Sequence, residues 1–379
     1  MSTRNSLYFN SSPNPTIGVE VELQIINKDT LDLEQSAPDI LKYFENDVQV
    51  KEELLNSIIE VNTSICKDIP AVRYDLRNKL SEVVSIAEKN NLLLLSTGTH
   101  PFANYHDQTI TDKDRYKNFV DRMQWPLRRM LITGLHVHIG VESGEKAIAI
   151  NNGLIRYIPI LIALSANSPY FEGELSGLVS TRSKIFEGLP STGIPPVLKN
   201  YSEFQKFMRT LQKANTIESI REVWWDIRPH PGYGTVEIRS CDSVTTLDQM
   251  VELAALIQCL VVGLSDHYDD GTQLPILDSW IVNENKWRAI RYGLDADLII
   301  DDTGNQQSIK GVAIDTIEKL MHRAKDLGCD DELYSIIHRI ENNSVSYIEQ
   351  ISKYNEAGSF KATIMGMVND FYRSLKSDY

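Results

Sequence analysis

Pairs of acidic and histidine side chains recur on alternating segments of the sequence. Residues 17–26 alternate apolar and polar side chains, as a half-buried strand does, and this places Glu20 and Glu22 on one face. A second alternating segment places His136 and His138 on one face. An isolated pair is also typical of a solvated strand face or of hydrogen-bonded core histidines. Two such pairs on two strands favour a binding site.

A third alternating segment, residues 235–241, places Glu237 and Arg239 on one face. Two further acids, Glu53 and Glu60, are seven residues apart. In a helix they would share one side of two turns, which is also the pattern of an exposed acidic face, and in an extended segment they would point to opposite faces. Because hard cations prefer carboxylate oxygen, an acid-rich and histidine-poor set suits Mg²⁺ or Mn²⁺ better than zinc.

Arginines supply the complementary charge. Residues 167–196 are rich in Ser, Gly and Pro, and we expect a functional loop that carries Arg182 and Lys184. Arg228 comes shortly before the segment that carries Glu237. A guanidinium can clamp a carboxylate or stabilise a transferring phosphoryl group, although each arginine alone also fits a surface salt bridge.

The elements that must position these residues indicate an α+β protein. Alternating segments and a short buried strand at residues 92–95 lie in the first two thirds, and the last third is almost wholly helical. Helical spacing is found at 38–44, 71–89, 112–131 with an interruption at Pro126, 151–166, 247–266, and from 280 onward. Neither a G-x-G-x-x-G nor a Walker-type loop occurs, so a nucleotide must be held in another way.

Composition narrows the class of protein. The 379 residues include 38 Lys and Arg against 52 Asp and Glu, a net charge of −14 that argues against a nucleic-acid partner. The longest uncharged stretch, 157–171, is too short to span a bilayer, so we expect no membrane association. Four cysteines lie far apart without a C-x-x-C pair and predict free thiols in a reduced, cytoplasmic protein.

Eight motifs occur in an order that resembles one known family. The motifs are Gly18-Val-Glu-Val-Glu, Glu53-Leu-Leu-Asn-Ser-Ile-Ile-Glu-Val-Asn-Thr, Gly98-Thr-His-Pro-Phe, His136-Val-His-Ile-Gly, Ala166-Asn-Ser-Pro-Tyr, Ser180-Thr-Arg-Ser, Trp225-Asp-Ile-Arg-Pro and Gly234-Thr-Val-Glu-Ile-Arg. From about residue 16 to its helical end, the chain resembles the carboxylate–amine ligases of the glutamate–cysteine ligase type 2 family.

The resemblance implies a single catalytic domain, residues 1–379, with a strand-rich part at about 14–245 and a helical part at about 246–379. Its fold would be glutamine-synthetase-like, with helices covering a curved antiparallel sheet that holds ATP and Mg²⁺ or Mn²⁺. ATP would phosphorylate a carboxylate, usually the γ-carboxyl of glutamate, and an amine, usually that of cysteine, would displace phosphate. The partners would be small molecules, and the family also suggests a homo-oligomer.

The resemblance also implies roles for individual residues. The metal ligands would be Glu20, Glu22, Glu53, Glu60, His138 and Glu237. Arg239 would meet the transferring phosphate, Arg182 and Arg228 would contact phosphate or the glutamate carboxylates, and His136, Thr99 and His100 would contribute to substrate binding. His100 could equally be a structural cap before Pro101. On this reading Glu237→Gln abolishes activity with little loss of folding.

Two other functions use the same residues. The chain could be a phosphotransferase acting on a guanidino or carboxylate group, which would release a stable phosphorylated product and no amide. It could also be a catalytically inactive protein that binds ATP or an amino acid. The sequence contains no pattern that identifies the amine.

Overall fold

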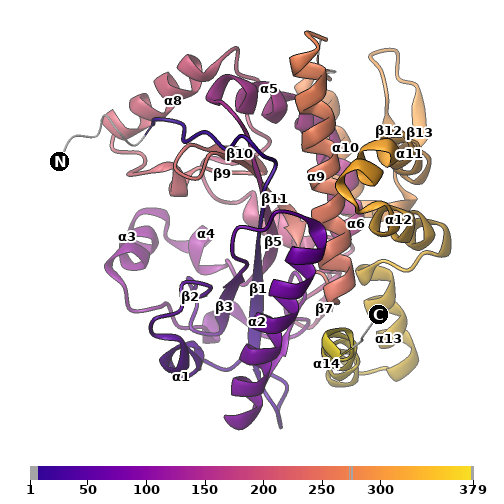
Figure 1. Ribbon diagram of the computed structural model, residues 1–379. Coiled ribbons are helices and arrows are strands. Elements are labelled where there is room, and N and C mark those ends of the chain that lie inside the picture. Colours follow the sequence, from indigo (N-terminus) through magenta and orange to yellow (C-terminus); the bar gives the residue numbers. More distant parts are fainter. Residues whose placement is uncertain (1–6, 273, 275, 377–379) are drawn as a thin grey trace.

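A seven-stranded antiparallel sheet organises the chain (Figure 1). The computed structural model describes residues 7–272, 274 and 276–376. The sheet order is β10-β11-β5-β1-β3-β2, and β4 also pairs with β1. The strands are β1 (Ile17–Asn27), β2 (Val50–Glu52), β3 (Ile58–Asn62), β4 (Leu92–Leu95), β5 (Gly134–Gly140), β10 (Ile227–His230) and β11 (Thr235–Asp242).

Two long helices cover the apolar face of this sheet. Side chains such as Val19 and Val21 of β1 are fully buried there, beneath α2 (Ile69–Lys89) and α9 (Leu247–Asp269). Asp68 caps the first turn of α2, and a capping box of Thr246 and Gln249 begins α9. The predicted helices at 71–89 and 247–266 are therefore confirmed.

Shorter elements build a second wall that faces the polar side of the sheet. They are α3 (Asp114–Met123), α4 (Trp125–Arg128), α7 (Thr181–Phe186) and the short strand β9 (Trp224–Trp225). The predicted helical segment breaks at Gln124, whose φ of 54° is left-handed, and Pro126 lies in the first turn of α4. The apolar side chains of these elements pack into one cluster.

The segment at 167–196 is more ordered than expected. It contains β6 (Tyr170–Phe171), β7 (Glu174–Leu175), α7 and β8 (Thr192–Gly193). The prediction that Arg182 and Lys184 lie on a loop is wrong, because both belong to α7. A helix of six residues is too short to show a helical period in the sequence, so the Ser and Gly residues around it dominated the pattern.

The remaining helices complete the fold. The predicted helix at 151–166 is part of a longer segment with two helices, α5 (Gly144–Leu154) and α6 (Ile158–Ser165). The other helices are α1 (Ala37–Leu41), α8 (Tyr201–Lys213), α10 (Ser279–Tyr292), α11 (Ile309–Leu327), α12 (Asp330–Asn342), α13 (Ser346–Ala357) and α14 (Phe360–Lys376). One hairpin, β12 (Asp297–Ile299) with β13 (Gln306–Ser308), interrupts the otherwise helical last third.

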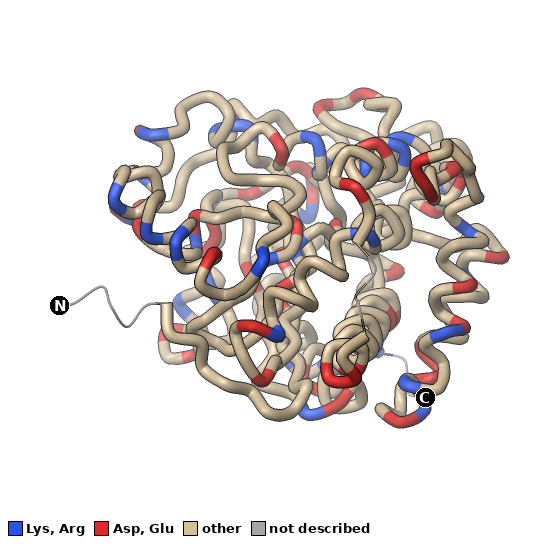
Figure 2. The backbone as a smooth tube through the Cα atoms, turned by 90° about the horizontal axis from the view of Figure 1, so that it is seen from above, with Lys and Arg blue, Asp and Glu red and all other residues tan. Residues whose placement is uncertain are grey.

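Two helical stretches, Gly144–Ser165 and Leu247–Asp269, are long and apolar enough to cross a membrane by length and composition alone. In each, 83% of the most apolar window is buried inside the fold, as in helices that form a protein core. Acidic and basic positions are interspersed along the backbone in the view from above (Figure 2).

Candidate active site

The polar face of the sheet and the wall of short helices enclose a cavity of about 430 Å³. The register of the strands brings its acidic lining together. Glu20 of β1 lies opposite His136 of β5, Glu22 opposite Glu60 of β3, and Glu237 of β11 opposite His138. All six residues expected to bind metal line this one cavity.

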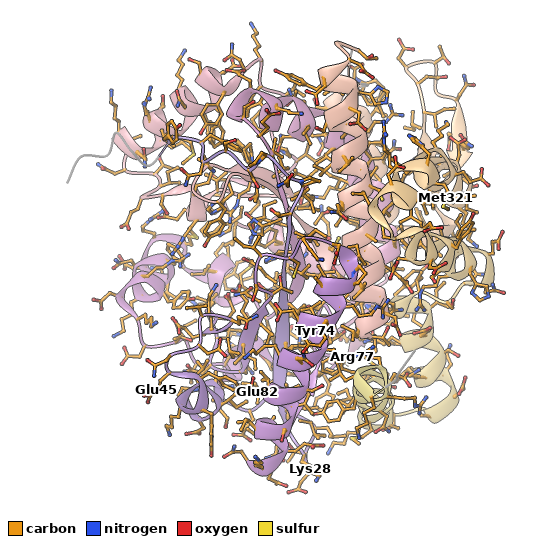
Figure 3. The ribbon with its side chains drawn as sticks, viewed as in Figure 1. Lys28, Glu45, Tyr74, Arg77, Glu82 and Met321 are labelled. Carbon is orange, nitrogen blue, oxygen red and sulfur yellow. The ribbon has the colours of Figure 1, made fainter. Side chains whose placement is uncertain are left out.

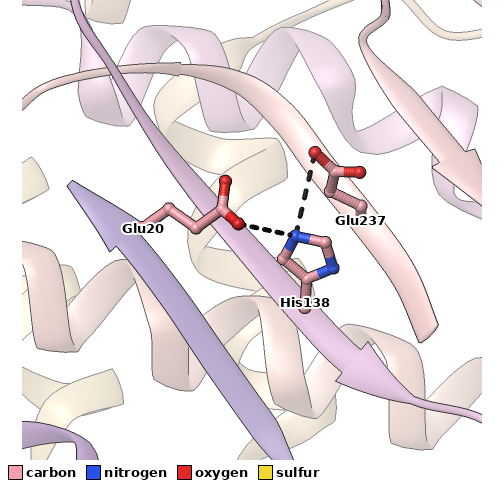
Figure 4. Close-up of side chains that lie close together, drawn as sticks. All are labelled: Glu20, His138 and Glu237. Atoms are coloured by element: carbon pink, nitrogen blue, oxygen red, sulfur yellow. Dashed lines mark ion pairs between the residues drawn. The ribbon is translucent and has the colours of Figure 1, made fainter. Parts of the chain in front are cut away.

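The first group of potential ligands consists of Glu20, His138 and Glu237 (Figure 4). His138 Nε2 lies 3.4 Å from Oε1 of Glu20 and 3.8 Å from Oε1 of Glu237. Its Nδ1 is 3.0 Å from the hydroxyl of Thr235, which leaves Nε2 facing the two carboxylates, buried and without a hydrogen-bond partner among the described residues. An orphaned ring nitrogen between two carboxylates fits a bound cation.

The second group consists of Glu22, Glu53 and Glu60, whose nearest oxygens lie within 4.8 Å of one another. Burial raises the pKa of Glu22 to about 7, and burial together with the neighbouring acids raises the pKa values of Glu53 and Glu60. Lys51 forms an ion pair with this group, with its Nζ 3.4 Å from Oε1 of Glu60. A donor set of three carboxylates fits Mg²⁺ or Mn²⁺, which would allow all three to ionise.

Neither the helical nor the extended arrangement expected for Glu53 and Glu60 is correct. Glu53 directly follows β2, the chain then turns, and Glu60 lies on β3, which pairs antiparallel with β2. The reversal brings together two side chains that a continuous strand would have pointed to opposite faces. Leu55, fully buried between the two strands, anchors this turn in the core.

Glu237 is held between two arginines. The Arg228 guanidinium contacts both carboxylate oxygens, at 2.6 and 3.2 Å, and Nη1 of Arg239 donates to Oε1. Although burial opposes ionisation, Arg228, Arg239 and His138 hold the pKa of Glu237 well below its usual range. Nη1 of Arg228 also donates to the carbonyls of Ile220 and Val223. Arg228 therefore directs its donors to the protein, and not to a substrate as expected.

Arg182 enters the cavity from the opposite wall. Its Nη2 donates to the carbonyl of Arg239 at 3.2 Å, and its Nη1 lies 4.0 Å from buried Asp242. A Cβ on Gly134 would come 2.2 Å from Nη2, so only glycine lets the guanidinium cross β5 at this point. The backbone N–H of Gly134 also donates to Glu22 at 2.6 Å.

Besides Arg228, three residues were expected to bind substrate, and of these His136 lines the cavity. His136 bridges the two acidic groups, with Nδ1 3.2 Å from Glu20 and Nε2 3.9 Å from Glu22. Thr99 and His100 are fully buried outside the cavity lining, where Thr99 donates to the carbonyl of Tyr170 and Nε2 of His100 lies 3.0 Å from the carbonyl of Leu31.

His100 has the structural role that was its alternative. Its Nδ1 accepts hydrogen bonds from the N–H groups of Phe102 and Ala103, and burial lowers its pKa to about 4. A neutral imidazole is therefore part of the turn after Gly98. The expectation that Thr99 and His100 form the substrate floor is wrong.

The sequence reasoning missed several residues that line the cavity. His230 follows Arg228 by two residues on β10, so strand alternation could have identified it, and its ring stacks on Tyr233 with centroids 4.1 Å apart. Arg115 of α3 and Arg221, before β9, carry no comparable pattern in the sequence.

The fold and the acidic, arginine-lined cavity fit an ATP-dependent carboxylate–amine ligase, and the comparisons with known proteins show that the chain is of this class. The particular family follows from the sequence model of glutamate–cysteine ligase family 2, which matches residues 16–365. The chain belongs to that family.

Relatives agree with this assignment, and a solved structure shares the fold. A putative glutamate–cysteine ligase 2-1 of Frankia alni is 43% identical over 348 residues, which are 90% of this chain and 91% of that protein. A putative glutamate–cysteine ligase 2 of Thermobifida fusca is 39% identical, covering 97% of this chain and 93% of the relative. A crystal structure of glutamate–cysteine ligase from Francisella tularensis with AMP has a TM-score of 0.72 at 14% identity, covering 97% and 90%. That likeness shows the shared fold.

Proposed function

We propose that the protein uses ATP to join the γ-carboxyl of glutamate to the amine of cysteine or a similar amino acid. The observation that carries the proposal is the arrangement of two separate acidic groups around one arginine. Arg239 hydrogen bonds with Glu237 of the first group, and its charge acts on Glu22 of the second. A cavity with two cation positions and a guanidinium between them can bring a triphosphate and a carboxylate together.

The nucleotide is proposed to bind at the end of the cavity that contains Glu20, His138 and Glu237. The exposed ring of Tyr233, stacked on His230, lies 5.7 Å from the ring of His138 between centroids and offers a platform for a purine base. Bound Mg²⁺ would neutralise the phosphate charge there, and an acidic cavity could therefore hold a polyanion.

The carboxylate substrate is proposed to bind at the other end, beside Glu22, Glu53, Glu60 and Arg182. Its carboxylate oxygen attacks the γ-phosphorus of ATP, the bond to ADP breaks, and an acyl phosphate forms. The amine nitrogen then attacks the acyl carbon, phosphate leaves, and the nitrogen loses a proton to give the amide. Arg239 lines this cavity, and its guanidinium would stabilise charge on the phosphoryl group during transfer.

The test is product analysis with ATP, Mg²⁺, glutamate and cysteine, in which we expect ADP, phosphate and γ-glutamylcysteine in equal amounts. Added hydroxylamine should trap the acyl phosphate as a hydroxamate. ATP consumption that is indifferent to every amino acid would refute the proposal, and a stable phosphorylated product without amide would identify a phosphotransferase instead. Where an acid of the cavity is replaced, as in Glu237→Gln, the matched control is Glu45→Gln. Glu45 is an exposed acid on the surface (Figure 3) and does not line the cavity.

We propose a cytoplasmic location for this activity. The four cysteines are buried free thiols in the described structure, which is compatible with a reducing compartment.

A further inference from the structure

The wall that faces the two acidic groups is apolar. Six of its side chains line the cavity and are at least nine-tenths buried: Tyr116, Phe119, Leu127, Ile132, Phe186 and Trp224. The ring of Phe119 packs edge-on against that of Trp224, with centroids 5.7 Å apart. Divalent cations, phosphates and the carboxylates of glutamate gain nothing from such a surface, so it points to a ligand group that the proposed reaction has not yet used.

The apolar wall adjoins the end of the cavity assigned to the carboxylate substrate. Tyr116 lines the cavity together with Glu53 and Glu60, and its hydroxyl lies 3.4 Å from the carbonyl of the adjacent Glu52, so the ring lies beside the second acidic group. The Arg182 guanidinium carbon lies 5.5 Å from the ring centroid of Phe186. A side chain resting on this wall would therefore belong to a molecule within reach of the proposed acyl phosphate.

Two exposed arginines, Arg115 and Arg221, also line this cavity. The Arg115 guanidinium carbon lies over the rings of Tyr116 and Phe119, at 5.7 and 5.3 Å from their centroids. Within the part of the chain that the structure describes, neither arginine forms an ion pair or a side-chain hydrogen bond. Arg221 is fixed near α3 because its neighbour Glu222 accepts from Arg122 at 2.8 Å.

We infer that the amine substrate is an α-amino acid with an apolar side chain, and that the class extends beyond cysteine to leucine, methionine and phenylalanine. The side chain packs on the apolar wall, Arg115 and Arg221 bind its carboxylate, and its amine points toward the acyl phosphate. This inference rests on the proposed ligase function and specifies the acceptor of that reaction. Cavity-lining guanidinium groups beside an apolar surface match an amino acid that offers a carboxylate and an apolar side chain from one carbon atom.

The test compares acceptors at fixed ATP, Mg²⁺ and glutamate by the mass of the amide and by kcat/KM. We expect leucine and phenylalanine to be used at least as well as cysteine, and at least about tenfold better than alanine, because missing methylenes leave the wall uncovered. An advantage of more than about tenfold for cysteine over both larger amino acids would overturn the inference.

Variants of the arginines test the binding of the acceptor's carboxylate separately from the packing of its side chain on the apolar wall. Arg115→Gln and Arg221→Gln should each raise the KM for leucine about 10- to 100-fold and leave the KM for leucinamide, which lacks the carboxylate, unchanged. Arg209→Gln is the matched control, since Arg209 is an exposed arginine of α8 outside the cavity lining. Equal effects on leucine and leucinamide would overturn the role of the arginines.

Phe119→Leu tests the wall itself. We expect it to lower kcat/KM for phenylalanine and to leave the KM for ATP unchanged. A higher KM for ATP with unchanged acceptor preference would show that the wall binds adenine, which would overturn the inference. If this variant does not fold, Tyr116→Phe, which keeps the ring, and Ile132→Val provide milder changes on the same wall.

A measurement of leucine binding distinguishes failure of the proposed ligase function from failure of the apolar amino-acid site. Trp224 is part of the wall, so its fluorescence should change on saturation with leucine and not with serine, and Trp224→Phe should remove the signal. Saturable binding of leucine without ADP formation would refute the proposed function and keep the apolar amino-acid site. No change in fluorescence together with no preference for apolar acceptors would overturn the site.

Discussion

Replacing Glu22 by glutamine should stabilise the metal-free protein at alkaline pH while removing its activity. Burial raises the pKa of Glu22 from an ordinary value of 4.5 to about 7, and its side chain is 15% exposed. At 1.36 kcal/mol for each pKa unit, ionising this carboxyl in the folded state opposes folding by about 3 kcal/mol above pH 7. Glutamine has the same shape, accepts the hydrogen bond from Gly134, and carries no charge.

The sign of the change in stability follows from the protonation of Glu22 in the folded and the unfolded chain at each pH. Below pH 4.5 the carboxyl is protonated in both the folded and the unfolded chain, so it contributes no difference. Between pH 4.5 and 7 the unfolded chain loses its proton while the folded chain keeps it, and the stability of the wild type falls as pH rises. Above pH 7 the loss is complete and constant.

The assay is urea denaturation followed by circular dichroism, with a chelator present, at pH 5 and pH 8. We expect Glu22→Gln to exceed the wild type by about 3 kcal/mol at pH 8 and by much less at pH 5. Mg²⁺ should stabilise the wild type more than the variant, because it binds the ionised carboxylates. Equal differences at both pH values, or a variant less stable than wild type at pH 8, would refute the electrostatic reasoning. Glu45→Gln, on the exposed surface in Figure 3, should show neither effect.

Three further predictions concern the residues around this site. Arg239→Lys should lower kcat about 10²- to 10³-fold in steady-state assays with near-native circular dichroism, since an ammonium cannot reproduce the planar guanidinium. Glu237→Gln should lose activity and also about 3 kcal/mol or more of stability in urea titrations, because it leaves Arg228 buried without its carboxylate; an unchanged midpoint would show that the pair is not needed for folding. His100→Ala should lower the melting temperature and leave the KM values for ATP and glutamate unchanged, and a raised KM would return His100 to the substrate site.

The expectation for Glu237→Gln changed because the sequence does not show cross-strand neighbours. Alternation alone predicts that Glu237 lines the surface of a cavity and that its replacement leaves the fold intact. The structure places Glu237 1% exposed and opposite Arg228 in the β10–β11 register. Whether a carboxylate is a solvated ligand or half of a buried ion pair depends on the adjacent strand, which period-2 patterning cannot identify.

The alternation of polar and apolar residues correctly predicts side-chain direction where a strand is continuous. It assigned Glu20, Glu22, His136 and His138 to one polar face because each pair lies within a single strand, and side-chain direction there follows from the backbone. It failed for Glu53, where a turn reverses the chain. The resemblance supplied that residue, and it also misplaced Thr99 and His100, whose side chains the local turn uses for its own hydrogen bonds.

The apolar wall could not have been predicted from the sequence. Phe119, Phe186 and Trp224 come from separate short elements spread over more than a hundred residues, and none carries a motif. Apolar residues in short helices are usually core, and here they become a ligand surface only because the polar side of the sheet faces them across the cavity.

The central position of β1 has a consequence for the order of folding during synthesis. This strand is made first, yet its partners β3, β4 and β5 follow over residues 58–140, and β11, which completes both β5 and the first acidic group, ends at Asp242. The chain must be made through residue 242 before the sheet can close. Pairing over such distances is slow, so the nascent chain carries unpaired apolar strand edges until the later strands have been made.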